Sequence, residues 1–475
     1  MRIQCPIKIN AFSHGIRQAI ISDNQTLTYR DFDYRIDACA QKLRAIGVKK
    51  RERVCILCAE SPEYIILLFA LWRLGAVACL LSQRFPLGAL KRQIRNVRGK
   101  IILTDNVKAC KNLAPIIVSL ESVVKKSAPK TLSYAVGYRF NQPVTILFTS
   151  GSSAVPKAVQ HSFANHYYSA LGSNQNIPVV VSSRWFLSVP LYHVSGLSIL
   201  FRCFLKGACV VICENKDICS IIKRRNLTHV SFVSTQLQRV LADKNGRAAL
   251  KKLKALLIGG SAIPEQLVIE ASRRKLPLYL SYGLTEMASQ VATTGALNRK
   301  GVSLKARLLA FRKARIAKDG EILVRGKTLF QGYVKNGRLA PAVDKNGWFH
   351  SGDIGFLRKG KFLEVKGRKD AMFVSGGENI FPEEIEYFLR KLDSIEEAVV
   401  TARPDDEYGF RPVAFVRPKR NKLLSGHTLS RHLSKFLPKF KIPDDFYLWP
   451  KGLVENGIKT PRLAFQRPSL QSRRL

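Results

Sequence analysis

The sequence has few acidic residues and no long apolar run. Its 475 residues include 34 Asp and Glu against 78 Lys and Arg, which gives a net charge of +44. No uninterrupted apolar segment approaches the roughly 18 residues that cross a bilayer. The residues that follow Met1 also lack the apolar segment of a signal peptide. These absences argue against a membrane-spanning or secreted protein, and we expect a soluble, cytoplasmic one.

Cysteine pairs at metal-ligand spacing are also scarce. The ten cysteines lie mostly within apolar segments, which is typical of small buried thiols in a reducing compartment. Cys55 and Cys58 have the spacing of a redox or zinc pair, but no second pair accompanies them. Three residues apart on a strand, the two thiols would face opposite ways. The pattern favours free buried thiols over a metal or redox site.

The excess of basic residues allows two interpretations. A polyanion site would need clustered cations that displace counterions from phosphates. Here the basic clusters, such as 49–51, 223–225 and 273–275, are dispersed, with no basic arm and no aromatic-interleaved RNA-binding pattern. We favour a compositional bias spread over a solvated surface, and we expect no specific nucleic-acid partner. Weak peripheral membrane association through this basic surface and homo-oligomerisation both stay open.

Short apolar segments alternate with helical patterns over the first 300 residues. Ser61, Pro62 and Glu63 form a helix start, with an N-cap, a proline at the first helical position and an early acid, and Gly75 marks the end. Strand, helix and strand in this order are typical of a parallel sheet. The predicted strands are 54–58, 76–81, 101–104, 116–118, 144–148, 185–189, 210–212, 230–233, 255–258 and 278–280.

The pattern changes towards the C-terminus. From Gly320, short strands and turns predict a small β-rich subdomain. After Asp370 an α+β pattern follows, with a strand at 371–374 and a helix near 429–440. The predicted fold class is therefore α/β, with a large N-terminal domain over 1–369 that holds two parallel α/β sheets and the β-rich subdomain. A small α+β C-terminal domain covers 370–475.

A polar segment at 149–157 follows one of the predicted buried strands. Gly151 would let the backbone approach a phosphate, while the flanking hydroxyls and amides donate hydrogen bonds and Lys157 adds positive charge. The segment is not a Walker loop, and an ordinary Ser/Gly turn is the alternative. Other polar turns, at 190–196, 259–262 and 281–286, also leave predicted strand ends. In open α/β sheets that edge is where ligands bind.

Taken together, five motifs resemble the adenylate-forming family of acyl-CoA synthetases, luciferases and peptide-synthetase adenylation domains, in sequence and in order. They are the loop at 149–157, Tyr-Gly-Leu-Thr-Glu at 282–286, Ser-Gly-Asp at 351–353, Gly-Arg-Lys-Asp at 367–370 and the late Lys459. The resemblance covers nearly the whole chain. Within the family, segments 190–197, 233–237, 281–290, 375–380 and 456–459 are most similar to the o-succinylbenzoate-CoA ligase branch of menaquinone biosynthesis.

The resemblance implies two half-reactions in one cleft, with ATP, Mg²⁺ and CoA. A carboxylate, in this branch o-succinylbenzoate, attacks the α-phosphate of ATP, and the thiol of CoA then displaces AMP. Because both partners of the first step are anions, catalysis should depend on electrostatics and positioning more than on acid–base chemistry. The C-terminal domain should be mobile, with Asp370 as the hinge.

The resemblance also implies roles for individual residues. The expected catalytic residues are Lys459, which would bridge the two reacting anions, Thr285 and Glu286. Mg²⁺ would lie on Glu286 and Thr149. Asp353 would accept hydrogen bonds from the ribose hydroxyls, and Arg368 would bind the same sugar or the α-phosphate. The full set of expected cofactor-binding residues is Thr149, Ser150, Gly151, Ser152, Ser153, Lys157, Gly260, Ser261, Tyr282, Gly283, Asp353, Arg368, Ser375, Gly376 and Gly377.

For the acyl pocket the expected residues are His193, Ser195, Gly196 and Thr235, bordered by the turns at 260–261 and 282–283. Three assignments have plain structural alternatives. Glu286 could be a solvated loop acid, Asp353 a turn residue and His193 a packed ring. No arginine is assigned to a second carboxylate of the acid.

The chain departs from the family pattern in three places. Ala154 replaces the usual glycine of the phosphate loop, Ile458 precedes Lys459 where many relatives have glycine, and 301–315 is unusually basic. Three alternatives stay open. They are a CoA ligase for another aryl or medium-chain acid, a stand-alone adenylation enzyme that loads a carrier protein, and a degenerate polyanion-binding protein.

Overall fold

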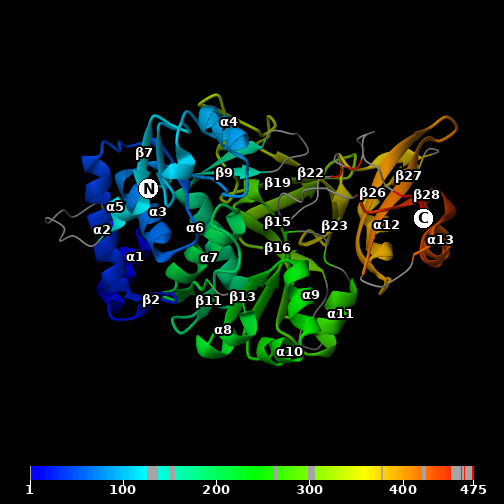
Figure 1. Cartoon of the computed structure of the whole chain (residues 1–475), viewed down its shortest axis with the longest axis horizontal. Coiled ribbons are helices and arrows are strands. Elements are labelled where there is room, and N and C mark those ends of the chain that lie inside the picture. Colours follow the sequence, from blue (N-terminus) through cyan, green and yellow to red (C-terminus); the bar gives the residue numbers. More distant parts are fainter. Residues whose placement is uncertain are drawn as a thin grey trace. The chain divides into compact units, whose positions relative to one another are not determined.

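The computed structural model describes residues 2–125, 137–149, 156–214, 217–260, 263, 265–297, 305–375, 378–419, 424–450, 462, 465 and 473–475. The chain forms two compact units (Figure 1). Unit 1 comprises Met1–Gly260, Ala271–Lys313 and Val324–Phe349, and unit 2 comprises Ser261–Glu270, Ala314–Leu323 and His350–Leu475.

The first large sheet of unit 1 has eight strands in the order β21-β20-β10-β9-β5-β4-β6-β7. Strands β9, β5, β4, β6 and β7 are parallel, as the sequence pattern predicts, whereas β10, β20 and β21 add an antiparallel edge. Their bounds are β4 Arg53–Leu57, β5 Val77–Leu80, β6 Ile101–Thr104, β7 Ile116–Ser119, β9 Pro143–Thr149, β10 Lys157–Ser162, β20 Gly332–Lys335 and β21 Arg338–Ala340.

The part of the second large sheet that lies in unit 1 runs in the order β17-β16-β15-β14-β13-β11-β12-β2-β3. The six strands from β15 to β2 are parallel, and the strands at both ends are antiparallel. Their bounds are β2 Gln18–Ile21, β3 Thr26–Thr28, β11 Arg184–Phe186, β12 Cys209–Val211, β13 His229–Phe232, β14 Ala255–Ile258, β15 Leu278–Leu284, β16 Ser289–Thr293 and β17 Ala306–Leu308. A separate antiparallel pair joins β1 (Arg2–Gln4) to β8 (Gly137–Arg139).

Helices connect these strands. They are α1 Pro6–His14, α2 Tyr29–Ala45, α3 Pro62–Leu74, α4 Leu87–Val97, α5 Leu120–Val124, α6 Phe163–Asn176, α7 Val194–Phe204, α8 Ile218–Arg224, α9 Ser234–Ala242, α10 Lys244–Leu250 and α11 Glu265–Arg273, with short 3₁₀ turns η1 at Lys108–Cys110 and η2 at Thr285–Met287. No helix in the described part of the chain is long and apolar enough to span a membrane.

Helix α3 begins and ends where the sequence predicts. The Ser61 hydroxyl accepts a hydrogen bond from the Tyr64 amide at 3.1 Å, and Pro62 is the first helical residue. Gly75 ends the helix with φ of 75°, in the left-handed region that favours glycine. The helix is buried from Tyr64 through Trp72, which is typical of a helix in the interior of a large domain.

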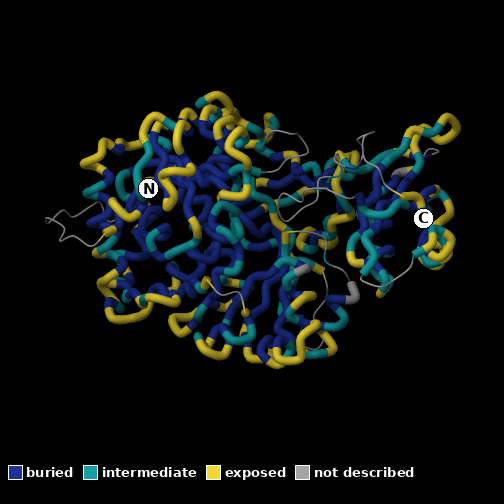
Figure 2. Tube along the Cα trace, viewed as in Figure 1, coloured by how far each residue is buried: buried dark blue, intermediate teal, exposed yellow. Residues whose placement is uncertain are grey.

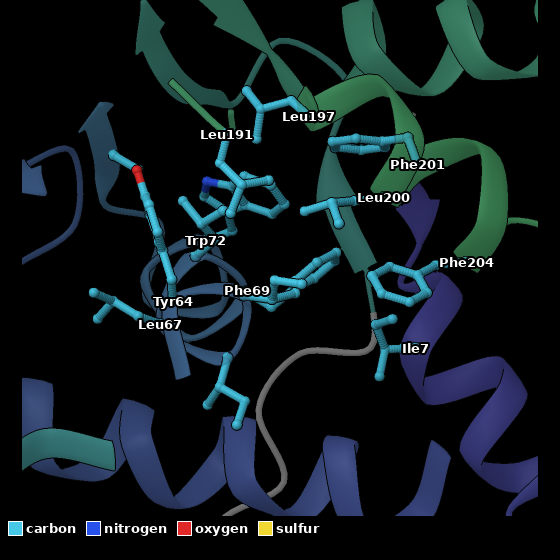
Figure 3. Close-up of a cluster of buried hydrophobic side chains, with 14 of the residues drawn as sticks. Ile7, Tyr64, Leu67, Phe69, Trp72, Leu191, Leu197, Leu200, Phe201 and Phe204 are labelled. Atoms are coloured by element: carbon cyan, nitrogen blue, oxygen red, sulfur yellow. The ribbon is translucent and has the colours of Figure 1, made fainter. Parts of the chain in front are cut away.

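Aromatic side chains of α3 and α7 form the centre of the core. Figure 3 shows Phe69 and Trp72 of α3 next to Phe201 and Phe204 of α7. The ring centroids are 5.6 Å apart for Phe69 and Phe204, and 5.5 Å apart for Trp72 and Phe201. The Trp72 indole N–H donates to the Val144 carbonyl of β9 at 2.8 Å. Burial of each such side chain contributes about 1.5–3 kcal/mol to stability, and Figure 2 shows the buried interior of this unit.

Unit 2 has the predicted α+β character. Its strands are β23 Phe362–Arg368, β24 Phe373–Ser375, β25 Glu378–Ile380, β26 Ile395–Asp405, β27 Gly409–Pro418 and β28 Asp445–Leu448, with β22 (Phe349–Arg358) entering it from unit 1. Its helices are α12 Pro382–Leu389, α13 Gly426–Leu433 and the 3₁₀ turn η3 Lys439–Lys441. Strands β18 (Arg312–Ile316) and β19 (Glu321–Gly326) and helix α11 cross the division between the units.

Two sequence predictions concern the C-terminal part of the chain. The helix predicted near 429–440 is wrong in its bounds, because α13 ends at Leu433. Pro438 lacks an amide hydrogen and cannot continue a helix, and it also disfavours helical backbone at the preceding residue. The domain boundary at Asp370 lies between β23 and β24, inside unit 2. This boundary was placed at the hinge of an expected domain motion, and it stays a prediction.

The ten cysteines are free thiols. Eight are buried, including Cys55 and Cys58, whereas Cys213 and Cys219 are half-buried. Burial raises the pKa of the Cys58 thiol above its ordinary value. Cys55 and Cys58 are therefore two of the buried free thiols.

Candidate active site

Three polar side chains lie on one face of the first sheet, on the neighbouring strands β9, β10 and β20. Thr149 ends β9 and lies opposite Lys157, which begins β10. Two residues further along β10, Val159 lies opposite Tyr333 of β20. Because side chains alternate along a strand and paired residues share a face, Thr149, Lys157 and Tyr333 are on the same side. The two ends of the predicted phosphate loop therefore lie side by side.

Glu286 contacts this face of the sheet, because its side chain is hydrogen-bonded to Tyr333. It is the middle residue of η2, which follows β15, and it is half-buried. The Tyr333 hydroxyl donates to Glu286 Oε1 at 2.7 Å, and the Lys157 ammonium lies 5.3 Å from the centroid of the Tyr333 ring. The Phe330 amide also donates to the Glu286 carbonyl at 2.7 Å. The structure thus brings Lys157 and Glu286 together, through a tyrosine that the sequence motifs did not indicate.

One buried histidine, His161, holds the backbone of Thr285, and a second, His166, packs against it. His161 Nε2 lies 2.7 Å from the Thr285 carbonyl, so this nitrogen carries the proton and donates. Burial lowers the pKa of His161 to about 4 and keeps the ring neutral at neutral pH. Behind it, His166 Nε2 lies 2.8 Å from the Thr145 hydroxyl of β9, and the two imidazole centroids are 4.9 Å apart. Strand β10 therefore positions both Lys157 and the turn that carries Glu286.

The carboxylate of Glu286 is suited to Mg²⁺. Mg²⁺ is usually bound by one or two carboxylates together with substrate phosphates and waters, rather than by a cage of protein ligands. Within the described residues, Glu286 has no ion-pair partner, and no group of three or more His, Cys, Asp or Glu could hold a metal. The residues present fit an ion shared between one protein carboxylate and a nucleotide.

Asp353 and Arg368 form a second polar group, in unit 2. They are paired residues of β22 and β23, and Arg368 Nη1 donates to Asp353 Oδ1 at 3.2 Å. Arg368 Nε also donates to Asp370 Oδ1 at 3.0 Å. The expected Ser-Gly-Asp turn is instead part of strand β22. Gly352 has φ of 72°, and a Cβ there would be 2.7 Å from Arg368 Nη2, so this position favours glycine. Carboxylate and guanidinium groups in contact suit the predicted ribose and phosphate contacts.

The start of α7 carries the first part of the predicted acyl pocket. His193 precedes the helix, and Ser195 and Gly196 are in its first turn. A Cβ at Gly196 would be 2.2 Å from the Pro190 carbonyl oxygen, so only glycine fits. Burial, together with the charge of Arg84, lowers the pKa of His193 to about 4. His193 is therefore neutral at neutral pH and can exchange hydrogen bonds with an acid without adding charge.

The other predicted pocket residues lie on β15 and at two strand ends. The pairing of β15 with β16 shifts between Tyr282 and Gly283, and a Cβ at Gly283 would be 2.2 Å from the Ser289 carbonyl oxygen. Gly260 follows β14 with φ of 91°. Thr235 is in the first turn of α9. The backbone places these residues at the carboxyl ends of parallel strands, where ligands of α/β proteins bind.

Arg202 is a charged residue beside this pocket that the sequence motifs did not indicate. It lies on α7 and is 1% exposed. Its Nη2 donates to Gln290 Oε1 at 2.7 Å and to the Ser289 hydroxyl at 3.4 Å, next to the shifted pairing at Gly283. Nε has no hydrogen-bond partner among the residues that the structure describes. The guanidinium is 5.2 Å from the centroid of the Trp185 ring.

Neither Arg202 nor the neighbouring Arg312 has a carboxylate partner among the described residues. Arg312 donates to the carbonyls of Gln290, Ala310 and Ser169 and to the Ser169 hydroxyl. Burial lowers the pKa of Arg202 to about 10 and that of Arg312 to about 9, so both stay protonated at neutral pH. A buried cation without a counter-charge is costly, and an anion bound nearby would be stabilised.

Several predicted site residues lie outside the described residues. They are Ser150, Gly151, Ser152, Ser153, Ser261, Gly376, Gly377 and Lys459, together with Ala154 and Ile458. Ser375 is described as the buried last residue of β24, and its hydroxyl accepts a hydrogen bond from Arg411 Nη1 at 3.4 Å. The roles given to these residues stay predictions.

Family models match most of the chain. A model of the AMP-binding enzyme family matches residues 8–334, and a model of the AMP-binding enzyme C-terminal domain matches residues 384–456. The chain belongs to the AMP-binding enzyme family. The family membership and the fold class inferred from the motifs are confirmed.

Curated members of this family align with nearly the full length of the chain. The 2-succinylbenzoate-CoA ligase of Oceanobacillus iheyensis is 32% identical over 440 residues, which are 90% of this chain and 91% of that protein. The ligase of the same name from Bacillus subtilis is 29% identical over 467 residues, or 94% and 95% of the two chains. The chain is thus similar to these ligases in both domains of the family.

Solved structures of the family also match nearly the full length of the chain. The o-succinylbenzoate CoA synthetase of Bacillus subtilis in complex with the acyl-adenylate intermediate OSB-AMP has a TM-score of 0.89 and 27% identity, with 99% of each chain covered. The complex of the same synthetase with ATP and magnesium ion also has a TM-score of 0.89 and 27% identity, with 98% of this chain and 100% of that chain covered.

Proposed function

We propose that the protein is an AMP-forming ligase that adenylates o-succinylbenzoate with ATP and transfers the acyl group to CoA, a step of menaquinone biosynthesis. The observation that carries the choice of acid is Arg202, a buried cation beside the pocket with no carboxylate partner among the described residues. An aromatic acid with a second carboxylate supplies that partner. The names of the relatives that align over about nine-tenths of the chain support the same substrate.

In the first half-reaction the carboxylate of the acid attacks the α-phosphate of ATP and pyrophosphate leaves. Lys157 and the loop that it ends bind the β- and γ-phosphates, and Asp353 and Arg368 bind the ribose. Glu286 and Thr149 hold Mg²⁺, which supplies positive charge to the phosphates. Lys459 joins the reacting carboxylate to the α-phosphate, so that cations offset the repulsion between two anions.

In the second half-reaction the thiol of CoA displaces AMP from the acyl-adenylate. The C-terminal domain rotates at Asp370, which withdraws Lys459 and brings the loop at 375–377 to the acyl group. Glycines at 376 and 377 leave room for the narrow pantetheine arm of CoA. One site then serves two successive reactions. Because ATP and CoA are its substrates, we place the enzyme in the cytoplasm.

A panel of carboxylic acids tests this proposal. The purified chain is incubated with ATP, Mg²⁺ and CoA, and acid-dependent pyrophosphate release and CoA-thioester formation are measured. The panel contains o-succinylbenzoate, benzoate, anthranilate and medium-chain fatty acids. We expect the highest kcat/KM for o-succinylbenzoate. A higher kcat/KM for another acid overturns the choice of substrate.

Two further arms separate the other candidate functions. Replacing CoA by a phosphopantetheinyl carrier protein distinguishes a ligase from a carrier-loading enzyme, and we expect thioester only with CoA. A salt-dependent gel shift with RNA or DNA, together with no acid-dependent pyrophosphate release, would instead indicate a polyanion-binding protein. Vesicle sedimentation and size-exclusion chromatography test the open predictions of membrane association and homo-oligomerisation.

A further inference from the structure

Tyr333 contacts both charged side chains of the adenylation site. Its hydroxyl donates to Glu286 Oε1 at 2.7 Å, and its ring lies 5.3 Å from the Lys157 ammonium. A hydrogen bond to a carboxylate is charge-assisted, and 5.3 Å is within the range of a cation–π contact. One side chain therefore offers a donor to the anion and an electron-rich face to the cation.

The geometry around Tyr333 is fixed by its neighbours. Tyr333 lies opposite Val159 on β10, two residues from Lys157, so the ammonium reaches the ring diagonally across the sheet. The Phe330 ring packs against Tyr333 with a centroid distance of 4.9 Å. The Phe330 amide donates to the Glu286 carbonyl at 2.7 Å. The segment 330–333 thus contacts Glu286 at two points, one on the main chain and one on the side chain.

Without this tyrosine, Lys157 and Glu286 could form an ion pair with each other instead of binding the nucleotide and its metal ion. The two side chains carry opposite charges and contact the same tyrosine. A lysine side chain has a flexible four-carbon stem, with which it can reach a nearby carboxylate. A direct ion pair would neutralise both groups. The carboxylate would then be a poorer metal ligand, and the ammonium would bind phosphates less well.

We propose that Tyr333 is a positioning residue that orients Glu286 towards the metal and keeps Lys157 and Glu286 from pairing with each other. The inference rests on the proposed function, because it concerns the ATP and Mg²⁺ of that reaction. The proposal gives Tyr333 no contact with the acid or with the reacting phosphorus. Its hydroxyl acts through Glu286 and its ring acts through Lys157, so the two actions can be separated by substitution.

The test compares Tyr333→Phe and Tyr333→Leu with the unchanged full-length chain. Calorimetry without the carboxylic acid substrate measures ATP binding, once with Mg²⁺ and once with EDTA. A pyrophosphate assay with o-succinylbenzoate measures activity as a function of Mg²⁺ concentration. For Tyr333→Phe we expect the Mg²⁺ concentration for half-maximal activity to rise about 10-fold or more, because hydrogen-bond partners of metal ligands have effects of this size. Binding of ATP in EDTA should be unchanged, because the ring remains.

For Tyr333→Leu we expect the same rise in the Mg²⁺ concentration for half-maximal activity. ATP binding in EDTA should also be weaker by about 2- to 5-fold, as loss of a cation–π contact implies. The matched control is Tyr34→Phe, which removes a hydroxyl from a tyrosine of α2 that is 45% exposed. It should change neither measurement. Thermal unfolding of each variant shows whether the fold is intact.

The outcomes separate this inference from the function on which it rests. If Tyr333→Phe leaves the Mg²⁺ dependence unchanged, or weakens ATP binding equally with Mg²⁺ and with EDTA, Tyr333 is not a positioning residue for Glu286. If the unchanged chain releases no pyrophosphate with o-succinylbenzoate, the proposed substrate fails. The calorimetric arm, which contains no acid, still tests the role of Tyr333.

Discussion

Among single residues, Arg202 gives the sharpest test of substrate choice. Replacing it by Met removes the buried cation but keeps much of the side-chain volume. We expect KM for o-succinylbenzoate to rise about 10- to 100-fold, because a charge-assisted hydrogen bond contributes about 1.5–3 kcal/mol. For an analogue in which hydrogen replaces the second carboxylate, KM should change less than about 3-fold. Pyrophosphate release with both acids provides the measurement.

Arg312 is the matched control, because it is also buried but donates to the carbonyls of Gln290, Ala310 and Ser169. Arg312→Met should lower the thermal unfolding temperature and change KM for the two acids by the same factor. An equal loss for both acids in Arg202→Met would remove the argument for a carboxylate contact at this residue.

At the same scale, the sequence indicates a candidate site residue where that residue belongs to a motif. Lys157, Glu286, Asp353 and Arg368 were predicted from short segments, and the structure places each in the expected polar surroundings. Tyr333 could not be found in this way, because its role comes from pairing with β10, which is more than 170 residues away. Arg202 did leave a signal, a single charge within the otherwise apolar segment 197–205.

At the scale of elements, the first turn of α7 depends on Gly196. An alanine Cβ there would lie 2.2 Å from the Pro190 carbonyl oxygen, far inside any real contact, so the helix start must shift. For Gly196→Ala we expect a loss of about 1–3 kcal/mol in unfolding free energy, as for other overpacked sites. Activity with o-succinylbenzoate should fall at least 10-fold, since His193 and Ser195 move with the helix. Chemical denaturation and the pyrophosphate assay provide the two measurements.

Gly88→Ala is the control for this prediction. Gly88 is the second residue of α4, and the nearest atom to an added Cβ is Arg92 Nη1 at 3.9 Å. Since alanine is the better helix former, we expect this variant to gain about 0.5–1 kcal/mol in stability and to keep its activity. Similar effects of the two substitutions would show that packing at Pro190 does not decide the outcome.

Elements with local signals were predicted correctly. Helix α3 has its N-cap, its first-turn proline and its terminal glycine within its own sequence, and its bounds agree with the prediction. Strands β10 and β20 carry no such signal, because their pairing brings together segments that are distant in the sequence. For the same reason the addition of β20 to the first sheet was not predicted.

At the scale of the whole molecule, buried histidines make stability depend on pH. Burial lowers the pKa of His161, His193 and His229 to about 4 in the folded chain, against 6.5 in the unfolded one. Between these values the unfolded chain binds more protons. Stability is therefore fully present above pH 6.5 and is lost as pH falls towards 4, by up to about 1.4 kcal/mol per pH unit for each histidine.

Unfolding midpoints in urea at pH 7.5, 6.5 and 5.5 measure this dependence. His229→Gln should reduce the slope below pH 6.5, because it removes one of the groups that take up a proton on unfolding. A midpoint that is constant from pH 7.5 to 5.5 would show that the buried rings do not titrate on unfolding.

The order of the two half-reactions gives a second prediction at this scale. Lys459→Ala should abolish acyl-adenylate formation, because the cation between the two reacting anions is lost. Thioester formation from supplied acyl-adenylate and CoA should be largely retained. Each half-reaction is measured separately, as pyrophosphate release and as CoA-thioester. Equal loss in both would contradict the proposed rotation at Asp370.

The distribution of thiols bears on how that rotation can be observed. Since eight of the ten cysteines are buried, Cys213 and Cys219 are the thiols that a maleimide dye would reach first in the native chain. Serine at these two positions would leave a chain nearly silent to labelling, without disturbing the interior. New cysteines introduced on either side of Asp370 could then carry a donor and an acceptor fluorophore, and the distance between them could be followed through a single catalytic cycle.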